Sequence, residues 1–121
     1  MERQIIMYEN VMYLGADYRG NAFTLSQQED HLVYVEGYVK LKPDDLIKRH
    51  HWVFDPERQV AYEAAQFKSL KTLGVRKKIS WDMIEYYGYE VTAKEISEVK
   101  QPGFVLSDSD LEPIRKKITG A

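Results

Sequence analysis

Apolar and polar residues alternate from Leu32 onward, and this period of two predicts a β-strand that ends near residue 41. One face of the strand holds Val33, Val35, Gly37, Val39 and Leu41, and the other holds Tyr34, Glu36, Tyr38 and Lys40. The residues from about 47 to 54 predict a second strand. Turn-forming residues at 55–58 then predict a hairpin that returns the chain as a third strand over 59–64.

Capping signals predict helices before and after this hairpin. Asn21 is a favourable N-cap for a helix over 22–28, and Thr92 with Glu95 forms a capping box for a helix over 93–100. A last helix is predicted from Leu111 to Ile118, with Ser107 and Asp108 at its start and basic residues at its end.

Three further segments carry weaker signals. Residues 1–15 fit neither period, so a helix and a short strand both remain open there. Residues 73–79 read as a short strand, and Ser80 predicts a helix that begins at Trp81. In that interpretation the tyrosines of 86–89 lie at a helix end stopped by Gly88, although an aromatic contact patch is an alternative.

These elements predict a single α+β domain over residues 1–121, with a small antiparallel sheet, an N-terminal helix and C-terminal helices. The chain has no cysteine, which excludes disulfides and thiolate chemistry, and cytoplasmic localisation is the expectation. A net charge of −2 gives no reason to expect nucleic acid. No signal peptide or membrane span is expected.

Two neighbouring histidines on the second strand are the candidates for chemistry. His50 and His51 point to opposite faces of a strand, and pairing of the two strands would bring Glu36 close to one of them. Glu63 on the returning strand is a second carboxylate. A histidine–carboxylate pair serves in general acid–base catalysis and also occurs as a simple buried ion pair, and both roles stay open.

Other chemistry has little support in the sequence. No HxH or HExxH spacing is present, and the glycines form no phosphate-binding or dinucleotide-binding pattern, so neither a metal site nor a cofactor is expected. The basic residues between 68 and 78 alternate with apolar ones. They favour a solvated face, with a phosphate or an acidic partner as the alternative.

The order of several motifs resembles that of a known family. The chain has Asn21-Ala22, then YVEGY at 34–38, then a His-x-Trp strand at 50–52. This order is similar to that of small bacterial and phage proteins with a compact papain-like fold of the NlpC/P60 or transglutaminase type. The resemblance covers about residues 17–82 and implies a papain-like core. In the family a cysteine precedes the Asn-Ala helix and an aspartate stands on the strand after the histidine.

The resemblance implies that the thiol mechanism has been lost. His50 matches the family histidine and Glu36 matches the strand glutamate. Tyr18, or Asp17 with a one-residue insertion, stands where the cysteine would be. Tyr62 stands at the position of the orienting acid, next to Glu63.

The leading expectation is therefore a non-catalytic accessory protein that binds a small ligand or a protein partner in a degenerate cleft. Residues expected to line the cleft are Tyr18, Asn21, Glu36, Tyr38, His50, Trp52 and Tyr62. One alternative is a hydrolase or transferase that uses His50 with Asp17, Glu36 or Glu63. Another is a structural subunit whose cleft is filled by its own side chains, and the sequence leaves the oligomeric state open.

Overall fold

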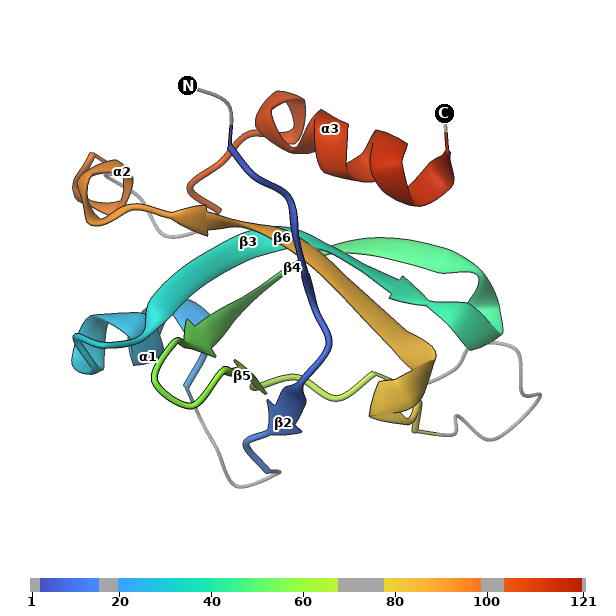
Figure 1. Cartoon of the computed structure of the whole chain (residues 1–121), viewed down its shortest axis with the longest axis horizontal. Coiled ribbons are helices and arrows are strands. Elements are labelled where there is room, and N and C mark those ends of the chain that lie inside the picture. Colours follow the sequence, from blue (N-terminus) through green and yellow to red (C-terminus); the bar gives the residue numbers. More distant parts are fainter. Residues whose placement is uncertain (1–2, 16–19, 68–77, 99–103, 121) are drawn as a thin grey trace.

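The computed structural model describes residues 3–15, 20–67, 78–98 and 104–120. It confirms the α+β class, with a curled, mixed six-stranded sheet and three α-helices (Figure 1). The strands are β1 (Ile6–Tyr8), β2 (Val11–Tyr13), β3 (Val33–Leu41), β4 (Leu46–Asp55), β5 (Val60–Glu63) and β6 (Ile84–Val91). The helices are α1 (Ala22–Gln28), α2 (Ala93–Ser97) and α3 (Asp108–Thr119), and single 3-10 turns lie at Lys42–Asp44 and Trp81–Met83.

The predicted strand pairing is confirmed at the centre of the sheet. β3 and β4 are antiparallel, with Glu36 directly opposite His51 and Gly37 opposite His50. β4 continues through the predicted turn into β5. One carboxylate oxygen of Asp55 accepts hydrogen bonds from the backbone N–H groups of Glu57 and Arg58, which closes that turn.

The N-terminal segment supplies the strands at both edges of the sheet. The strand order is β1-β6-β3-β4-β5-β2, and only two residues separate β1 from β2 along the chain. In Figure 1 this blue segment descends across the sheet and ends beside β5. β2 is parallel to β5 while every other pair is antiparallel.

Residues 81–91 differ from the sequence prediction. The helix expected from Trp81 is wrong, because the 3-10 turn there gives way at once to β6, which lies between β1 and β3. The β-favouring tyrosines of this segment pair with β3 on both faces, and that burial outweighs the local capping signal of Ser80. Gly88 does not end a helix but pairs with Gly37 inside the sheet.

Most of the remaining sequence predictions are confirmed, and one lies mostly outside the described residues. Residues 6–8 and 11–13 are strands, which resolves the ambiguity at the N-terminus. The capping box at Thr92 and the Asn21 cap of α1 are confirmed. The predicted last helix begins earlier than expected, at Asp108, with Ser107 as its N-cap. α2 ends at Ser97 in the described part of the chain, and most of the short strand predicted over 73–79 lies outside it.

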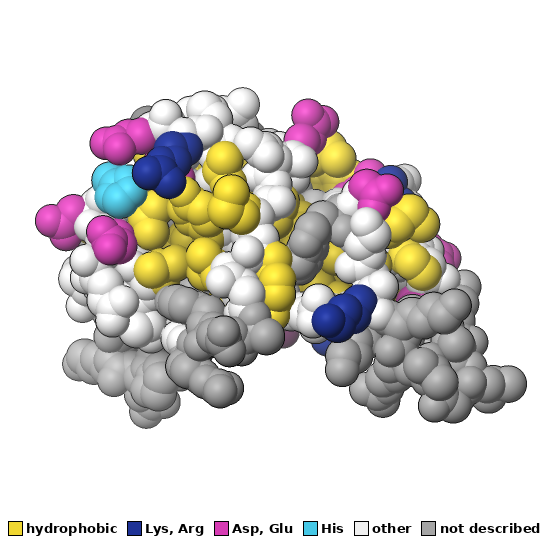
Figure 2. Space-filling model, turned by 90° about the horizontal axis from the view of Figure 1, so that it is seen from below, with side chains coloured by type: hydrophobic (Ala, Val, Ile, Leu, Met, Phe, Trp, Pro, Cys, Tyr) yellow, Lys and Arg dark blue, Asp and Glu magenta, His cyan; other side chains and the backbone are white. Residues whose placement is uncertain are grey.

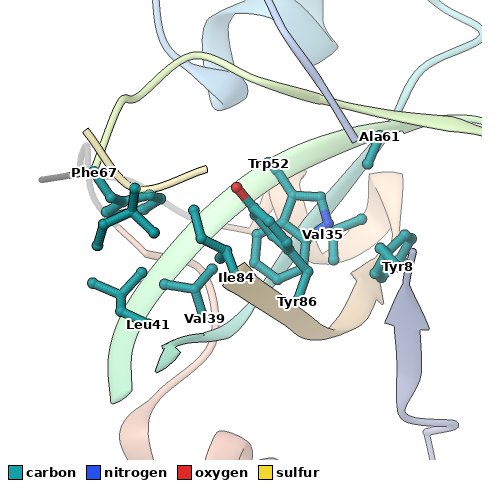
Figure 3. Packing of buried hydrophobic residues seen from close by; sticks show 10 residues of the cluster. Tyr8, Val35, Val39, Leu41, Trp52, Ala61, Phe67, Ile84 and Tyr86 are labelled. Atoms are coloured by element: carbon teal, nitrogen blue, oxygen red, sulfur yellow. The ribbon is translucent and has the colours of Figure 1, made fainter. Parts of the chain in front are cut away.

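The sheet has a hydrophobic core on each face. The inner, concave face carries a cluster rich in aromatic rings (Figure 3), formed by Tyr8, Val35, Val39, Leu41, Trp52, Ala61, Phe67, Ile79, Ile84 and Tyr86. The outer face is covered by α1 and α3, and its core is formed by Ala22, Leu32, Tyr34, Val53, Tyr89, Val91, Leu106, Leu111 and Ile114. Both faces of β3 and β4 are packed, so alternate residues along each strand belong to opposite cores.

Part of the hydrophobic surface stays exposed. Figure 2 shows hydrophobic side chains across the middle of the face seen from below, with charged side chains around them. Four large apolar side chains among the described residues are substantially exposed, namely Met7, Met12, Met83 and Phe104. Among the helices that the structure describes, none has the length and apolar character needed to cross a membrane.

Candidate functional site

The sheet separates the residues that the sequence analysis placed in one cleft. His50, Trp52 and Glu63 lie on the inner face, while Glu36, Tyr38 and Tyr62 lie on the outer face, as their strand register requires. Asn21 is the N-cap of α1, where its side chain accepts a hydrogen bond from the N–H of Thr24. Asp17 and Tyr18 lie outside the described residues. The inner and outer groups are therefore two separate clusters.

On the inner face, His50 is paired with a buried carboxylate. Its Nε2 lies 2.6 Å from Oε1 and 2.9 Å from Oε2 of Glu63, whose side chain is 1% exposed. The hydroxyl of Tyr86 donates a second hydrogen bond, 3.1 Å long, to Oε1 of Glu63. Burial and the neighbouring Glu63 carboxylate raise the pKa of Tyr86 well above its usual value, so this phenol remains a donor.

The His50 ring lies at the edge of the inner core. Its side chain is 15% exposed, and its centroid is 5.0 Å from that of Phe67 and 6.2 Å from that of Trp52. The ammonium of Lys48 lies 5.7 Å from the centroid of Phe67. Figure 3 shows the Tyr86 hydroxyl on the Phe67 side of the cluster, with Tyr8 at the opposite side. Polar groups thus converge at the Phe67 end of an apolar core.

Two polar atoms deeper in this core have no hydrogen-bond partner among the described residues. They are the indole N–H of Trp52 and the hydroxyl of Tyr8, whose rings meet edge to face with centroids 5.6 Å apart. A buried donor without a partner costs about 1–3 kcal/mol. The inner face therefore contains donors that a bound polar group or a water molecule would satisfy.

On the outer face, Glu36 joins the sheet to the segment that precedes α3. Its buried carboxylate accepts hydrogen bonds from the N–H of Val105 at 2.7 Å, the N–H of Leu106 at 2.8 Å and the hydroxyl of Tyr34 at 2.7 Å. The guanidinium of Arg49 lies 3.9 Å away. The glutamate that the sequence singled out for a cleft thus anchors the start of α3.

The hydroxyl of Tyr34 connects Glu36 to His51. It lies 2.9 Å from Nδ1 of His51 while it donates its one hydrogen to Glu36. Because that hydrogen is already committed, the phenol oxygen must accept from His51, which places the imidazole proton on Nδ1. The other ring nitrogen, Nε2, then carries a lone pair.

Burial and the neighbouring His50 lower the pKa of His51 to about 4. Histidine in an unfolded chain has a pKa of about 6.5. Between these values the unfolded chain binds a proton that the folded protein does not, so stability falls as the pH is lowered from about 6.5 toward 4 and is fully present above 6.5.

We therefore expect the wild-type protein to lose about 1 kcal/mol more stability than His51→Gln between pH 7 and pH 5, a value reduced because the ring is half-exposed. Urea unfolding at the two pH values measures the difference. Equal losses in both proteins would contradict the assignment of this titration to His51.

Arg49 and Phe104 lie beside this outer cluster. The guanidinium of Arg49 donates to Asp108 at 2.6 Å and to the carbonyl oxygen of Leu106, and it stands 4.0 Å from the centroid of Phe104. The ring of Phe104 is 42% exposed and lies 5.4 Å from that of His51. The sequence analysis did not single out Arg49 or Phe104. The link between Glu36, Tyr34 and His51 did have a signal in the sequence, because Tyr34 and Glu36 share a strand face and Glu36 pairs with His51 in register.

A third histidine lies near two acids on the β4–β5 turn. Ligand atoms of His31, Asp55 and Glu57 lie within 4.8 Å of one another. Both oxygens of Asp55 already accept hydrogen bonds, from two backbone N–H groups of the turn and from the hydroxyl of Tyr62 at 3.1 Å. Asp55 and Tyr62 thus have a structural role in this hairpin.

Three grooves formed by described residues lie away from His50 and His51. A groove of about 420 Å³ lies between the end of α1 and the start of α2, with Gln27, Tyr34 and Thr92 in its walls. Two others, of about 330 and 250 Å³, lie beside β1. None of the residues predicted for the cleft lines these three grooves.

Comparison of the chain with known protein families, with curated proteins and with solved structures finds no match. The papain-like resemblance therefore stays a prediction from sequence. The His50 and His51 clusters are therefore the basis for a proposal about function.

Proposed function

We propose that this protein is a small cytoplasmic domain that binds a ligand where His50 meets Glu63, at the Phe67 end of the inner face. The observation that supports the proposal best is the buried Glu63 carboxylate held between an imidazole and a phenol in an otherwise apolar core. Ligand sites are mostly apolar with a few convergent polar groups of this kind. A chain without cysteine has no structural need for an oxidising compartment.

The charges at this site favour a ligand that carries an anionic group. Glu63 is 1% exposed and already accepts from His50 and Tyr86, so its negative charge is not presented to a ligand. Lys48 is exposed and lies on the same face of β4 as His50. Phe67 supplies an apolar surface between the side chains of Lys48 and His50. A small carboxylate or phosphate compound with an apolar part fits this arrangement.

We expect a screen of small carboxylates and phosphates, with benzoate, citrate, inorganic phosphate and AMP among them, to raise the unfolding temperature. A ligand at 100 times its Kd adds about 2.7 kcal/mol to the free energy of unfolding. The shift should disappear in His50→Ala and in Lys48→Ala and persist in Lys94→Ala, which removes an exposed lysine on α2.

A screen without any stabilising compound would count against the proposal, as would a shift that survives in both His50→Ala and Lys48→Ala. If the natural ligand is the acidic side chain of a protein partner, benzoate should still bind weakly at the same residues. Isothermal titration of each variant with the best compound separates lost affinity from altered stability.

A second candidate is a hydrolase or transferase with His50 as its base. The hydrogen bond from Nε2–H of His50 to Glu63 favours it, because a carboxylate that accepts from Nε2 fixes the tautomer and leaves Nδ1 as the reactive nitrogen. Asp17 lies outside the described residues and Glu36 lies on the other face, so among the described acids Glu63 is the partner. Hydrolysis that is lost in His50→Ala with folding intact would support this candidate, and unchanged hydrolysis would exclude it.

A further inference from the structure

The outer cluster differs from the His50 site in position and in chemistry. It consists of Glu36, Tyr34 and His51 in a hydrogen-bonded row, on the face of the sheet opposite to that of His50. Glu36 and Tyr34 are fully buried, whereas His51 is half-buried. The buried end of the row is thus a carboxylate, and its more accessible end is an imidazole.

The row fixes both the orientation and the tautomer of His51. Burial and the Glu36 carboxylate raise the pKa of Tyr34 well above its usual value, so its proton stays on the phenol and is directed to Glu36. His51 in turn donates from Nδ1 to the phenol oxygen, and Nε2 keeps its lone pair. A base positioned through hydrogen bonds by a second and a third group is the arrangement that general-base catalysis requires.

We propose that His51 is the general base of a hydrolytic site on the outer face of the sheet, with a small activated ester as its class of substrate. Phe104 offers an exposed aromatic surface next to the imidazole for an apolar part of the ester. Arg49 lies on the same face two residues along β4, and its guanidinium, which pairs with Asp108, packs over the ring of Phe104.

The reaction consumes only the ester and one water molecule. Nε2 of His51 takes a proton from water as the water oxygen bonds to the ester carbonyl carbon. The bond from that carbon to the leaving oxygen then breaks, and the leaving oxygen receives the proton from Nε2. During the step the positive imidazole is stabilised by Glu36 through Tyr34.

The low basicity of His51 limits the reaction to esters with good leaving groups. A base whose pKa is about 4 is unprotonated at neutral pH but accepts a proton weakly. The rate with p-nitrophenyl acetate should therefore exceed the buffer rate and stay constant between about pH 5.5 and pH 8. A histidine of ordinary pKa would lose activity below about pH 6.5.

The test is the hydrolysis of p-nitrophenyl acetate by the full chain and its variants. His51→Gln should lower kcat by about a hundredfold, whereas His31→Gln, which removes an exposed histidine elsewhere, should keep the wild-type rate. Tyr34→Phe should lower kcat and leave KM unchanged, because Tyr34 is a positioning residue that does not touch the substrate. Phe104→Ala should raise KM and leave kcat unchanged.

Chemical labelling tests the site without relying on variants that fold poorly. Diethyl pyrocarbonate acylates an unprotonated imidazole nitrogen and releases ethanol and carbon dioxide. We expect mass spectrometry of the wild-type protein to find His51 labelled at the same rate at pH 5.5 and at pH 7.5. A His51 that stays unlabelled, or a His51→Gln protein that hydrolyses the ester at the wild-type rate, would overturn the proposal. Neither result depends on the ligand proposed for His50.

Discussion

Replacing Gly37 with alanine is expected to lower the free energy of unfolding by about 3 kcal/mol or more. A Cβ atom at this position would lie 2.0 Å from the carbonyl oxygen of Tyr87 and 2.6 Å from Cα of Gly88. Both atoms belong to the backbone of β6, which pairs with β3 at this point. No side-chain rotation can relieve the clash, so the two strands must move apart.

The matched control is Gly120→Ala at the C-cap of α3. Gly120 has φ of 74°, but a Cβ there would meet nothing within 4 Å. Its replacement therefore tests the conformational freedom of glycine alone and should cost about 1 kcal/mol. Urea unfolding of both variants gives the comparison. Similar losses for the two substitutions would show that β6 does not approach β3 as closely as the structure indicates.

Replacing Glu36 with alanine is expected to cost about 4 kcal/mol. The change removes the acceptor of three hydrogen bonds and leaves the N–H groups of Val105 and Leu106 and the hydroxyl of Tyr34 buried without it. It also removes a buried negative charge that lies 3.9 Å from the partly buried Arg49. The segment before α3 should then separate from the sheet more readily than the sheet itself unfolds.

Hydrogen exchange distinguishes this local effect from general destabilisation. In Glu36→Ala the amides of Val105 and Leu106 should lose more protection than those of β3, while Glu112→Ala, an exposed glutamate on α3, should leave both unchanged. Glu36→Gln keeps one acceptor oxygen and should fall between the two. A loss of less than 1 kcal/mol in Glu36→Ala would contradict the anchoring role.

The sequence predicted the elements whose signals are local. The alternation at 33–41, the turn after Asp55 and the caps at Asn21, Thr92 and Ser107 each depend on a few neighbouring residues, and all are found in the structure. β6 was missed because its tyrosines form a strand only through pairing with β3 and β1, which no local pattern records.

The candidate site was predicted in part. His50 and Glu63 were both selected, and the hairpin brings them into contact. Glu36 was expected near one of the two histidines, and the register places it opposite His51, the histidine that the sequence did not favour. Tyr34, which lies between Glu36 and His51, is only two residues from Glu36. The backbone N–H groups of 105–106 come from a segment about 70 residues away, and only the folded chain shows that they meet Glu36.

The N-terminal segment, which supplies both edge strands of the sheet, has a consequence for the order of folding during synthesis. Residues 6–13 leave the ribosome before their partner strands, which cover residues 60–63 and 84–91. The nascent segment therefore stays unpaired until most of the chain has been made, because β1 cannot form its hydrogen bonds with β6 before β6 has been synthesised. Pairings this distant in sequence form slowly. Until they form, the apolar residues of 5–14 are exposed to other chains. The strands of the sheet that are synthesised first are thus the last to be paired.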